Sequence, residues 1–275
     1  MEKIHVHIED DIADTLFITL YAKSEASKQK SPLITDDIAC DLVDRIDYDF
    51  SKYKNKSASI IGVAIRSAHF DQMIKTFIAA HERPVIVLPG CGLDSRVHRL
   101  GKVAEKATFY ELDLLEVTNL RKRLMPPLAH EEYMAASILT TDWMDNILVK
   151  HPHGDFMFVI EGVLMYFSEK ENRLVFSELA KRFKGAEIHF DMLNKWMSTK
   201  SSIHDTVRKT KATFKFGIDD DREIEKWHPN LRFIRSYLFN DFRGGRRMGL
   251  VLWLLMHVIP VFKKSSRLLM YKIGE

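Results

Sequence analysis

A turn with two glycines follows the first segment of the sequence that is continuously apolar. Residues 85–88 predict a strand covered on both faces, and Gly90 and Gly92 follow it just before a short helical segment. Two glycines separated by one residue let the backbone approach a ligand closely at a helix N-terminus. Taken alone, the pair is equally typical of a tight strand-to-helix turn that binds nothing.

A carboxylate stands where the second predicted strand ends. Residues 108–112 form that strand, and Asp113 follows it, about 20 residues after the glycines, as in nucleotide-binding folds. A carboxylate there can accept hydrogen bonds from both hydroxyls of a ribose, a role shared by binders of NAD and of S-adenosylmethionine. The alternative is that Asp113 only places a negative charge near the N-terminus of the next helix.

Asp142 and Trp143 follow a third, less apolar predicted strand at residues 137–141. A carboxylate beside an aromatic ring suits an adenine, because the acid accepts from the exocyclic amine while the ring or backbone contacts the base. Asp142 is also an ordinary helix N-cap by its position. Both roles are compatible with each other.

Glu161 directly follows the fourth predicted strand, residues 156–160. An unpaired charge at the end of a buried apolar strand is costly, so we expect Glu161 to face a cationic group of a ligand. Gly162 would leave room for the sulfonium end of S-adenosylmethionine.

A dinucleotide-binding site is the main alternative on the same fold class. The dinucleotide fingerprint has a third Gly or Ala three residues after the second glycine, where helix and strand pack closely. Ser95 stands there, followed by the bulky Arg96. This favours S-adenosylmethionine over NAD, and an NAD-dependent oxidoreductase remains the alternative enzyme.

The elements that must position these residues alternate along the chain. Further strands are predicted at residues 187–190, 233–237 and 268–272, a helix at 68–82, and another from the capping box of Ser168 and Glu171 to about residue 184. Strands that alternate with helices indicate a mainly parallel sheet with helices on both faces, whose ligands bind at the carboxyl ends of the strands.

The division of the chain is predicted as one domain over residues 1–275. Residues 1–60 show helical stripes and no strand, so they are interpreted as an N-terminal helical cap on the α/β core at 61–275. Residues 192–230 are polar and basic with interspersed aromatic residues, and are predicted to cover the substrate.

Composition narrows the function classes. With 46% apolar residues and a net charge of +3, the chain predicts a globular protein without a strong phosphate-binding field, so no nucleic-acid partner is expected. The basic clusters 121–123 and 243–247 are interpreted as surface. The apolar run 248–262 is too short to span a bilayer and is predicted to be a buried or membrane-surface helix, with no stable membrane insertion.

The cysteines, the N-terminal residues and the histidines near residue 151 do not indicate a further functional site. Cys40 and Cys91 are expected to be free thiols, and residues 1–11 lack a secretory pattern, which favours the cytoplasm. His151, His153 and Asp155 are interpreted as loop residues, and no metal site is predicted.

These motifs, in order, resemble the leucine carboxyl methyltransferase family, and within it the bacterial branch related to polyketide O-methyltransferases of the tetracenomycin type. The resemblance runs over most of the chain, from residues 62–66 through 88–96, 110–113 and 141–143 to 161–166. It implies a Rossmann-like class I methyltransferase with a seven-stranded sheet of order 3-2-1-4-5-7-6, the seventh strand antiparallel, and S-adenosylmethionine as cofactor.

The resemblance also implies residue roles. Arg66 would hold the cofactor carboxylate, which fits the fork geometry of guanidinium, and Glu161 would lie near the methionine moiety. By the same carry-over the glycines shape the methionine pocket, Asp113 holds the ribose, and Asp142 and Trp143 frame the adenine. The predicted cofactor-binding residues are therefore Arg66, Gly90, Gly92, Asp94, Asp113, Leu114, Asp142, Trp143, Glu161 and Tyr166. Two departures, Pro89 before the glycines and Trp143 after the acid, remove no charge that the cofactor needs.

The acceptor is left open. Transfer to the oxygen of a small-molecule or carrier-bound substrate is predicted, and a carboxylate acceptor needs no base, whereas a hydroxyl does. Tyr166, His189 and Asp191 are candidates for that base, although each is also explained as a packing or sheet residue. The alternatives are methylation of a protein C-terminal carboxylate and a cofactor-binding partner protein without activity.

Overall fold

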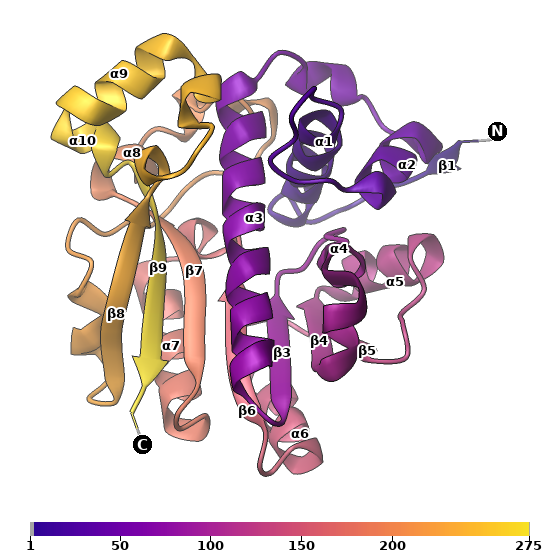
Figure 1. The fold of residues 1–275 in the computed structure, drawn as a ribbon, viewed down its shortest axis with the longest axis vertical. Helices are drawn as coiled ribbons and strands as arrows, with labels where there is room; N and C mark the ends of the chain where they lie inside the picture. Colours follow the sequence, from indigo (N-terminus) through magenta and orange to yellow (C-terminus); the bar gives the residue numbers. More distant parts are fainter. Residues whose placement is uncertain (1–2, 275) are drawn as a thin grey trace.

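The computed structural model describes residues 3–274, and one seven-stranded sheet organises them (Figure 1). In chain order its strands are β3 (Pro84–Pro89), β4 (Thr108–Asp113), β5 (Glu131–Ala135), β6 (Asp155–Ile160), β7 (Glu187–Leu193), β8 (Leu231–Leu238) and β9 (Ser266–Ile273). Their spatial order is β5-β4-β3-β6-β7-β9-β8, and β9 is antiparallel to both neighbours. Numbered within this sheet alone, the order is 3-2-1-4-5-7-6, which confirms the prediction.

Helices cover both faces of the sheet (Figure 1). They are α1 (Leu16–Ser27), α2 (Asp37–Arg45), α3 (Ser57–Ala80), α4 (Arg96–Leu100), α5 (Leu115–Leu124), α6 (Asp142–Lys150), α7 (Glu169–Arg182), α8 (Lys195–Ser198), α9 (Leu250–Val258) and α10 (Pro260–Lys263). A two-stranded parallel sheet of β1 (Ile4–His5) and β2 (Ile46–Asp47) lies beside α2. The capping box of Ser168 and Glu171 at the start of α7 is confirmed.

The alternation of side chains along each strand separates two cores. Val85 and Val87 pack in a cluster with α6 and α7 on one face, while Ile86 and Leu88 pack with α3 and α4 on the other. Period-two alternation of apolar residues on both faces is what a sheet sandwiched between helices requires. Because both faces of these strands are buried, the polar residues that follow each strand lie beyond its carboxyl end, at the edge of the sheet.

Three sequence predictions are corrected. Residues 1–60 were expected to contain no strand, but β1 and β2 pair there, and strands of two residues are too short to show an alternating pattern. The third strand lies at β5, and not at residues 137–141, which form the loop after it. β5 is an edge strand that pairs only with β4, so it does not need the continuous apolar run on which the prediction relied. The helix predicted at 68–82 begins eleven residues earlier, as α3, because its N-terminal half is buried on several sides and shows no single apolar stripe.

The cap is connected to the core through α3. Its N-terminal residues Ile60, Val63 and Ala64 form a cluster with α1, whereas Phe70, Ile74 and Phe77 pack on the sheet. The predicted boundary at residue 60 thus falls inside a single helix. In Figure 1, α1 and α2 lie on one side of the upper half of α3, and α9 and α10 lie on the other.

We predict that Phe158→Ala in β6 destabilises the protein by about 3–5 kcal/mol, because a large ring is removed from a closely packed core. Phe158 is fully buried, and its ring centroid lies 4.8 Å from that of Phe183 in an edge-to-face contact. Unfolding in guanidinium chloride measures the loss. Val149→Ala on α6, where Val149 is 82% exposed, is the control and should change stability by less than about 0.5 kcal/mol. An equal loss in both variants would contradict the assignment of the core.

Candidate active site

A cavity of about 310 Å³ opens at the carboxyl ends of β3, β4 and β6, where the strand order reverses between β3 and β6. Side chains from the cap cover it, including Ile12, Thr15, Thr19 and Lys23. The strand ends contribute Pro89, Gly90, Cys91, Gly92, Asp113, Leu114, Glu161, Gly162 and Val163, and the loop after β5 contributes residues 136–139. Ligands of open α/β sheets bind at this kind of switch point.

The glycine turn requires glycine at both positions. Gly90 and Gly92 have φ values of +70° and +53°, which side chains rarely tolerate. A Cβ on Gly90 would also lie 2.3 Å from the side chain of Val163. The N–H of Gly90 donates to the carbonyl of Leu112 at 2.7 Å, so the turn is fixed to the end of β4. Backbone therefore lies at the cavity wall, without side chains in between.

Asp113, the last residue of β4, is hydrogen-bonded to the glycine turn. Its Oδ2 accepts from the N–H of Gly92 at 2.7 Å, and its Oδ1 accepts from the N–H of Leu114 at 2.8 Å. Burial raises the pKa of Asp113, while these two hydrogen bonds act in the opposite direction. Each carboxylate oxygen keeps a further lone pair, and the residue lines the cavity.

Arg121 corrects the interpretation of residues 121–123 as a surface cluster. It is fully buried, pairs with Glu111 through Nε at 2.9 Å and donates from Nη1 to the carbonyl of Gly92 at 3.1 Å. Its guanidinium lies 4.7 Å from the ring centroid of Tyr133. Arg121 therefore holds the glycine turn in place from its buried side.

Glu161 is held between two arginines instead of being free for a ligand. Its Oε1 accepts from Arg66 Nε at 3.1 Å and from Ser67 Oγ at 2.9 Å, and its Oε2 accepts from Arg96. Burial opposes ionisation of this carboxyl, but the guanidinium groups of Arg96 and Arg66 outweigh it and lower its pKa to about 2. Glu161 is therefore ionised throughout the neutral range.

This ion pair belongs to a larger buried cluster, which we call the ion cluster. Its cations are Lys23, Arg66, Arg96 and Arg99, and its anions are Asp36, Asp71, Asp94, Glu161 and Asp191. Asp94, for example, lies 2.9 Å from Lys23 Nζ and 2.7 Å from Arg99 Nη1. Four cations face five carboxylates, so the ion cluster has a formal charge of −1.

Asp191 joins the ion cluster to the end of β6. Its Oδ2 accepts from Arg66 Nη1 at 2.6 Å, and its Oδ1 accepts from the N–H of Gly162 at 2.6 Å. Gly162 has a φ of +74°, and a Cβ there would lie 3.0 Å from Arg66 Nη2. Asp191 therefore fixes the positions of Arg66 and Gly162.

A second cavity of about 350 Å³ adjoins the first and shares Thr15, Thr19 and Gly162 with it. Its walls are largely apolar: Ile18, Val63, Met165, Tyr166, Leu193, Trp196, Met197, Val207, Phe214, Phe239, Met248, Leu252, Met256 and Phe262. Its polar lining comes chiefly from Ser59, Arg66, Asp191, His204, Asp205 and Thr206. The three shared residues form the junction between the two cavities.

Comparison with known proteins decides the family. Residues 15–180 match the family model described as leucine carboxyl methyltransferase, which is more than half of the chain. The chain belongs to the leucine carboxyl methyltransferase family. It is a methyltransferase that uses S-adenosylmethionine as cofactor, which excludes the NAD-dependent alternative and the inactive partner protein.

Two relatives match the chain over nearly its full length. The tetracenomycin polyketide synthesis O-methyltransferase TcmP of Streptomyces glaucescens is 29% identical over 94% of this chain and 96% of its own. The S-adenosyl-L-methionine-dependent methyltransferase dpfgK of Gibberella zeae is 24% identical over 93% of this chain and 92% of its own. A crystal structure of a Thermobifida fusca protein assigned as a methyltransferase has a TM-score of 0.59 at 11% identity, covering 94% and 95% of the two chains, and it supports the fold.

Within this methyltransferase, four residues predicted to bind the cofactor are placed elsewhere. Arg66 lines the second cavity and not the first. Trp143 is 1% exposed and packs in the core against Phe158, so its predicted role at the adenine is wrong. Asp142 begins α6 and does not line the cavity, where residues 136–139 stand instead. Tyr166 lines the second cavity rather than the first, and burial raises its pKa to about 12.

Other predicted residues lie outside both cavities. His189 pairs with Glu187 at 2.9 Å within β7, which confirms its interpretation as a sheet residue. His151 contacts the hydroxyl of Tyr110 at 2.9 Å. Residues 3–274 contain no cluster of His, Cys, Asp and Glu suited to a metal, and no helix among them is long and apolar enough to cross a membrane.

Sequence reasoning identified Arg66, Asp94 and Asp191 but missed the other members of the ion cluster, which are Lys23, Asp36, Asp71, Arg96 and Arg99. Lys23 is 3% exposed and lines the first cavity. It follows Leu16 and Thr19 on the predicted apolar stripe of the first helix, where a lysine is out of place unless it is paired. A lysine within this apolar stripe was the sequence feature that could have indicated a buried ion pair.

We predict that Asp113→Asn weakens binding of S-adenosylmethionine by roughly tenfold or more, because a charged acceptor of hydroxyl hydrogen bonds becomes an amide. Isothermal titration calorimetry measures the dissociation constant. Asp155→Asn is the matched control, since Asp155 begins β6 at the opposite end of that strand from Glu161. Unchanged affinity in Asp113→Asn would contradict the assignment of the first cavity to the cofactor.

Glu161→Gln is predicted to destabilise the protein by about 3–5 kcal/mol at pH 7, because Arg66 and Arg96 lose a buried counter-charge. The folded-state pKa of Glu161, about 2, lies below the ordinary value. Its stabilising contribution is therefore complete above pH ~4.5 and disappears as pH falls towards 2. Denaturant unfolding of both proteins over this range measures the difference, with the exposed Glu105→Gln as control. A difference that stays constant with pH would contradict the ion-pair assignment.

Proposed function

We propose that this protein transfers the methyl group of S-adenosylmethionine to a hydroxyl oxygen of a small, apolar, aromatic acceptor of the polyketide kind. The observation that carries the proposal is the junction at Thr15, Thr19 and Gly162, where a polar, charged cavity meets an apolar one. Methyl transfer from a sulfonium is an in-line displacement and needs two such sites that meet at the methyl group. The name of the relative TcmP supports the acceptor class.

The charges of the first cavity suit the methionine end of the cofactor. That end carries a sulfonium, an ammonium and a carboxylate, with a net charge of +1, and the ion cluster has a formal charge of −1. Lys23 lines this cavity and is the cation for the carboxylate, and Glu161, although paired with Arg66 and Arg96, lines the cavity as the anion for the ammonium. The ribose then lies at Asp113, and the adenine lies beside residues 136–139.

The second cavity suits a hydroxyl better than a carboxylate. Among the described residues that line it, Arg66 is the only lysine or arginine, and Arg66 is already paired with Glu161 and Asp191. A carboxylate acceptor, including a protein C-terminus, would bring a further negative charge into an apolar site without a free cation. The lining rings of Tyr166, Trp196 and Phe214 instead favour a flat aromatic acceptor.

His204 is the residue that we propose as general base. Its Nδ1 lies 3.4 Å from the N–H of Val207, 3.4 Å from Thr206 Oγ1 and 3.7 Å from Asp205 Oδ1, which leaves Nε2 for the acceptor. Burial lowers the pKa of His204, against the effect of Asp205, so the imidazole is neutral at physiological pH. Ser59 donates to Asp205 and holds that carboxylate beside the ring.

The bond changes follow from this placement. S-adenosylmethionine supplies the electrophilic methyl group, and the acceptor oxygen forms the new C–O bond as the C–S bond breaks and its electron pair passes to sulfur. His204 takes the hydroxyl proton at Nε2 in the tautomer that carries its own proton on Nδ1; in that tautomer the 3.4 Å hydrogen bond from the Val207 N–H to Nδ1 is given up and Nδ1–H faces Asp205 instead. Asp205 then stabilises the imidazolium, and the apolar lining of the second cavity limits the water near the reacting atoms.

An acceptor panel tests the proposal. The purified protein is incubated with labelled S-adenosylmethionine and polycyclic phenols, matched aromatic carboxylic acids, or a peptide with a free C-terminal leucine. We expect transfer to the phenols, giving methyl ethers that resist mild alkali. Transfer to the acids or the peptide, giving esters that alkali hydrolyses, would contradict the hydroxyl assignment.

We predict that His204→Gln lowers kcat by roughly 10²–10⁴-fold without changing the affinity for S-adenosylmethionine, because only proton removal is lost. In the wild type the rate should be constant above pH ~6.5 and fall below it, as the imidazole gains a proton through its lowered pKa. His153→Gln, in an exposed loop, is the control. An unchanged kcat or pH profile in His204→Gln would contradict the role of His204.

A further inference from the structure

Helix α9 exposes an apolar face that no described part of the chain covers. Val251 and Val258 are 72% and 77% exposed, and Leu250, Leu254 and Ile259 are also exposed. Positions 251, 254 and 258 follow the i, i+3, i+7 spacing of one helical face. Isolated aliphatic residues are common on protein surfaces, but a contiguous stripe of this kind marks an interaction site.

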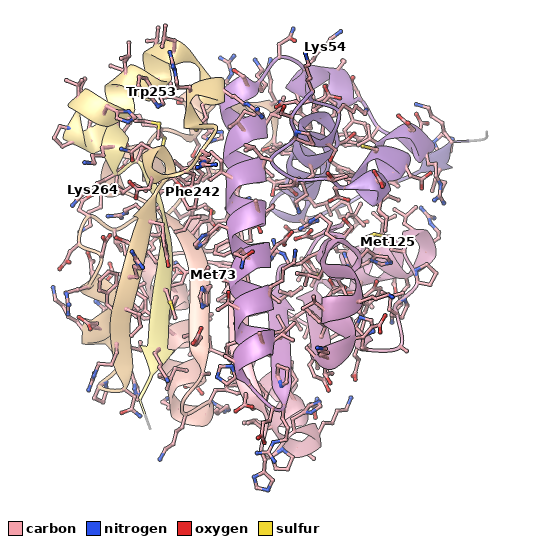
Figure 2. The ribbon with its side chains drawn as sticks, viewed as in Figure 1. Lys54, Met73, Met125, Phe242, Trp253 and Lys264 are labelled. Atoms are coloured by element: carbon pink, nitrogen blue, oxygen red, sulfur yellow. The ribbon has the colours of Figure 1, made fainter. Side chains whose placement is uncertain are left out.

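The charged residues that flank this face are mainly positive, with the exposed Asp241 just before them as the exception. Residues 242–274 contain no aspartate or glutamate, and Arg243, Arg246, Arg247, Lys263 and Lys264 flank α9 and α10, all of them exposed. The guanidinium of Arg246 lies 5.3 Å from the ring centroid of the half-buried Trp253. Figure 2 shows Trp253 and Lys264 on the same side of α3, at the upper left of the view, with Lys264 nearer the outer edge.

We propose that α9 and its basic flanks form a docking surface for an anionic lipid membrane. A short apolar helix with exposed Leu and Val side chains and a tryptophan, flanked by Lys and Arg side chains, combines the apolar and basic groups that bind at the surface of a charged bilayer. Both requirements are met by the same short segment. An anionic bilayer is favoured over a protein partner because it satisfies the exposed aliphatic side chains and the flanking Lys and Arg side chains together.

The inward-facing side of α9 connects the docking surface to the second cavity. Leu252 and Met256 point inward and line the second cavity, together with Phe262 from α10. The segment that faces the bilayer is therefore also a wall of that cavity. An apolar acceptor dissolved in lipid would reach the cavity past α9, a route that rests on the proposed function, whereas the docking itself does not.

Vesicle flotation tests the docking. The full-length protein is mixed with vesicles of phosphatidylcholine alone, or of equal parts phosphatidylcholine and phosphatidylglycerol. We expect flotation with the anionic vesicles only, and its loss at high salt. Failure to float with anionic vesicles would overturn the proposal.

Two sets of variants assign the contact to α9. Val251→Glu with Val258→Glu should reduce the bound fraction by roughly tenfold or more. Lys263→Gln with Lys264→Gln should reduce vesicle affinity by about 30-fold. Val149→Glu with Leu115→Glu, on exposed aliphatic positions of α6 and α5, is the control and should float as the wild type does. Equal loss in the control, or unchanged flotation in the α9 variants, would contradict the proposal.

Two further measurements test whether the double variant still folds and whether a second copy of the chain covers this face. Val251 and Val258 do not line either cavity, so their double variant should bind S-adenosylmethionine as tightly as the wild type. Size-exclusion chromatography coupled to light scattering reports self-association. A wild-type dimer that the double variant converts to a monomer, with no vesicle binding, would assign the face to a second copy of the chain and overturn the proposal. The acceptor panel is unaffected by this outcome, so the two proposals fail independently.

Discussion

The carboxylate of Glu161 lies between Arg66 and Arg96, and three separate parts of the structure meet at this contact. Arg66 comes from α3, Arg96 begins the helix after the glycine turn, and Glu161 ends β6. A buried charge without a partner is costly, so the positions of Arg66, Arg96 and Glu161 depend on one another. The cavity at the strand ends therefore has a charged floor whose geometry is set before any ligand arrives.

The remaining charges extend this constraint into the cap and the second cavity. Asp94 reaches Lys23 on α1, which brings the cap over the first cavity. Asp191 binds both Arg66 and the N–H of Gly162, and so holds the glycine at the junction. A single network thus places the cover of the cofactor cavity and the opening between the two cavities. The acceptor wall, in contrast, is built from apolar side chains and owes its shape to packing.

The sequence predicted the fold where local patterns are strong. The β6 segment and the glycine turn are continuous apolar or glycine signals, and both were assigned correctly together with Asp113 at the end of β4. The edge strand β5 was misplaced because its side chains, such as Glu132, need not be apolar. Trp143 was misassigned because an aromatic residue beside an acid has the same sequence signature in a core as at an adenine.

The ion cluster and the acceptor wall were not predictable in the same way. Arg96 and Arg99 appear in the sequence as ordinary polar residues of a short helix, and only the fold brings Asp36 and Asp71 to them. His204 lies in a segment without regular periodicity, and Ser59, which donates to the neighbouring Asp205, is 146 residues before Asp205 in the chain. Contacts over such separations leave no trace in spacing or composition.

A crystal structure with S-adenosylhomocysteine tests the account most directly. The account predicts that the ribose hydroxyls bind Asp113, that the amino acid end lies among Lys23, Arg66 and Glu161, and that the sulfur faces the second cavity across the junction at Gly162. An adenine bound against Asp142, or a sulfur directed away from the second cavity, would contradict it.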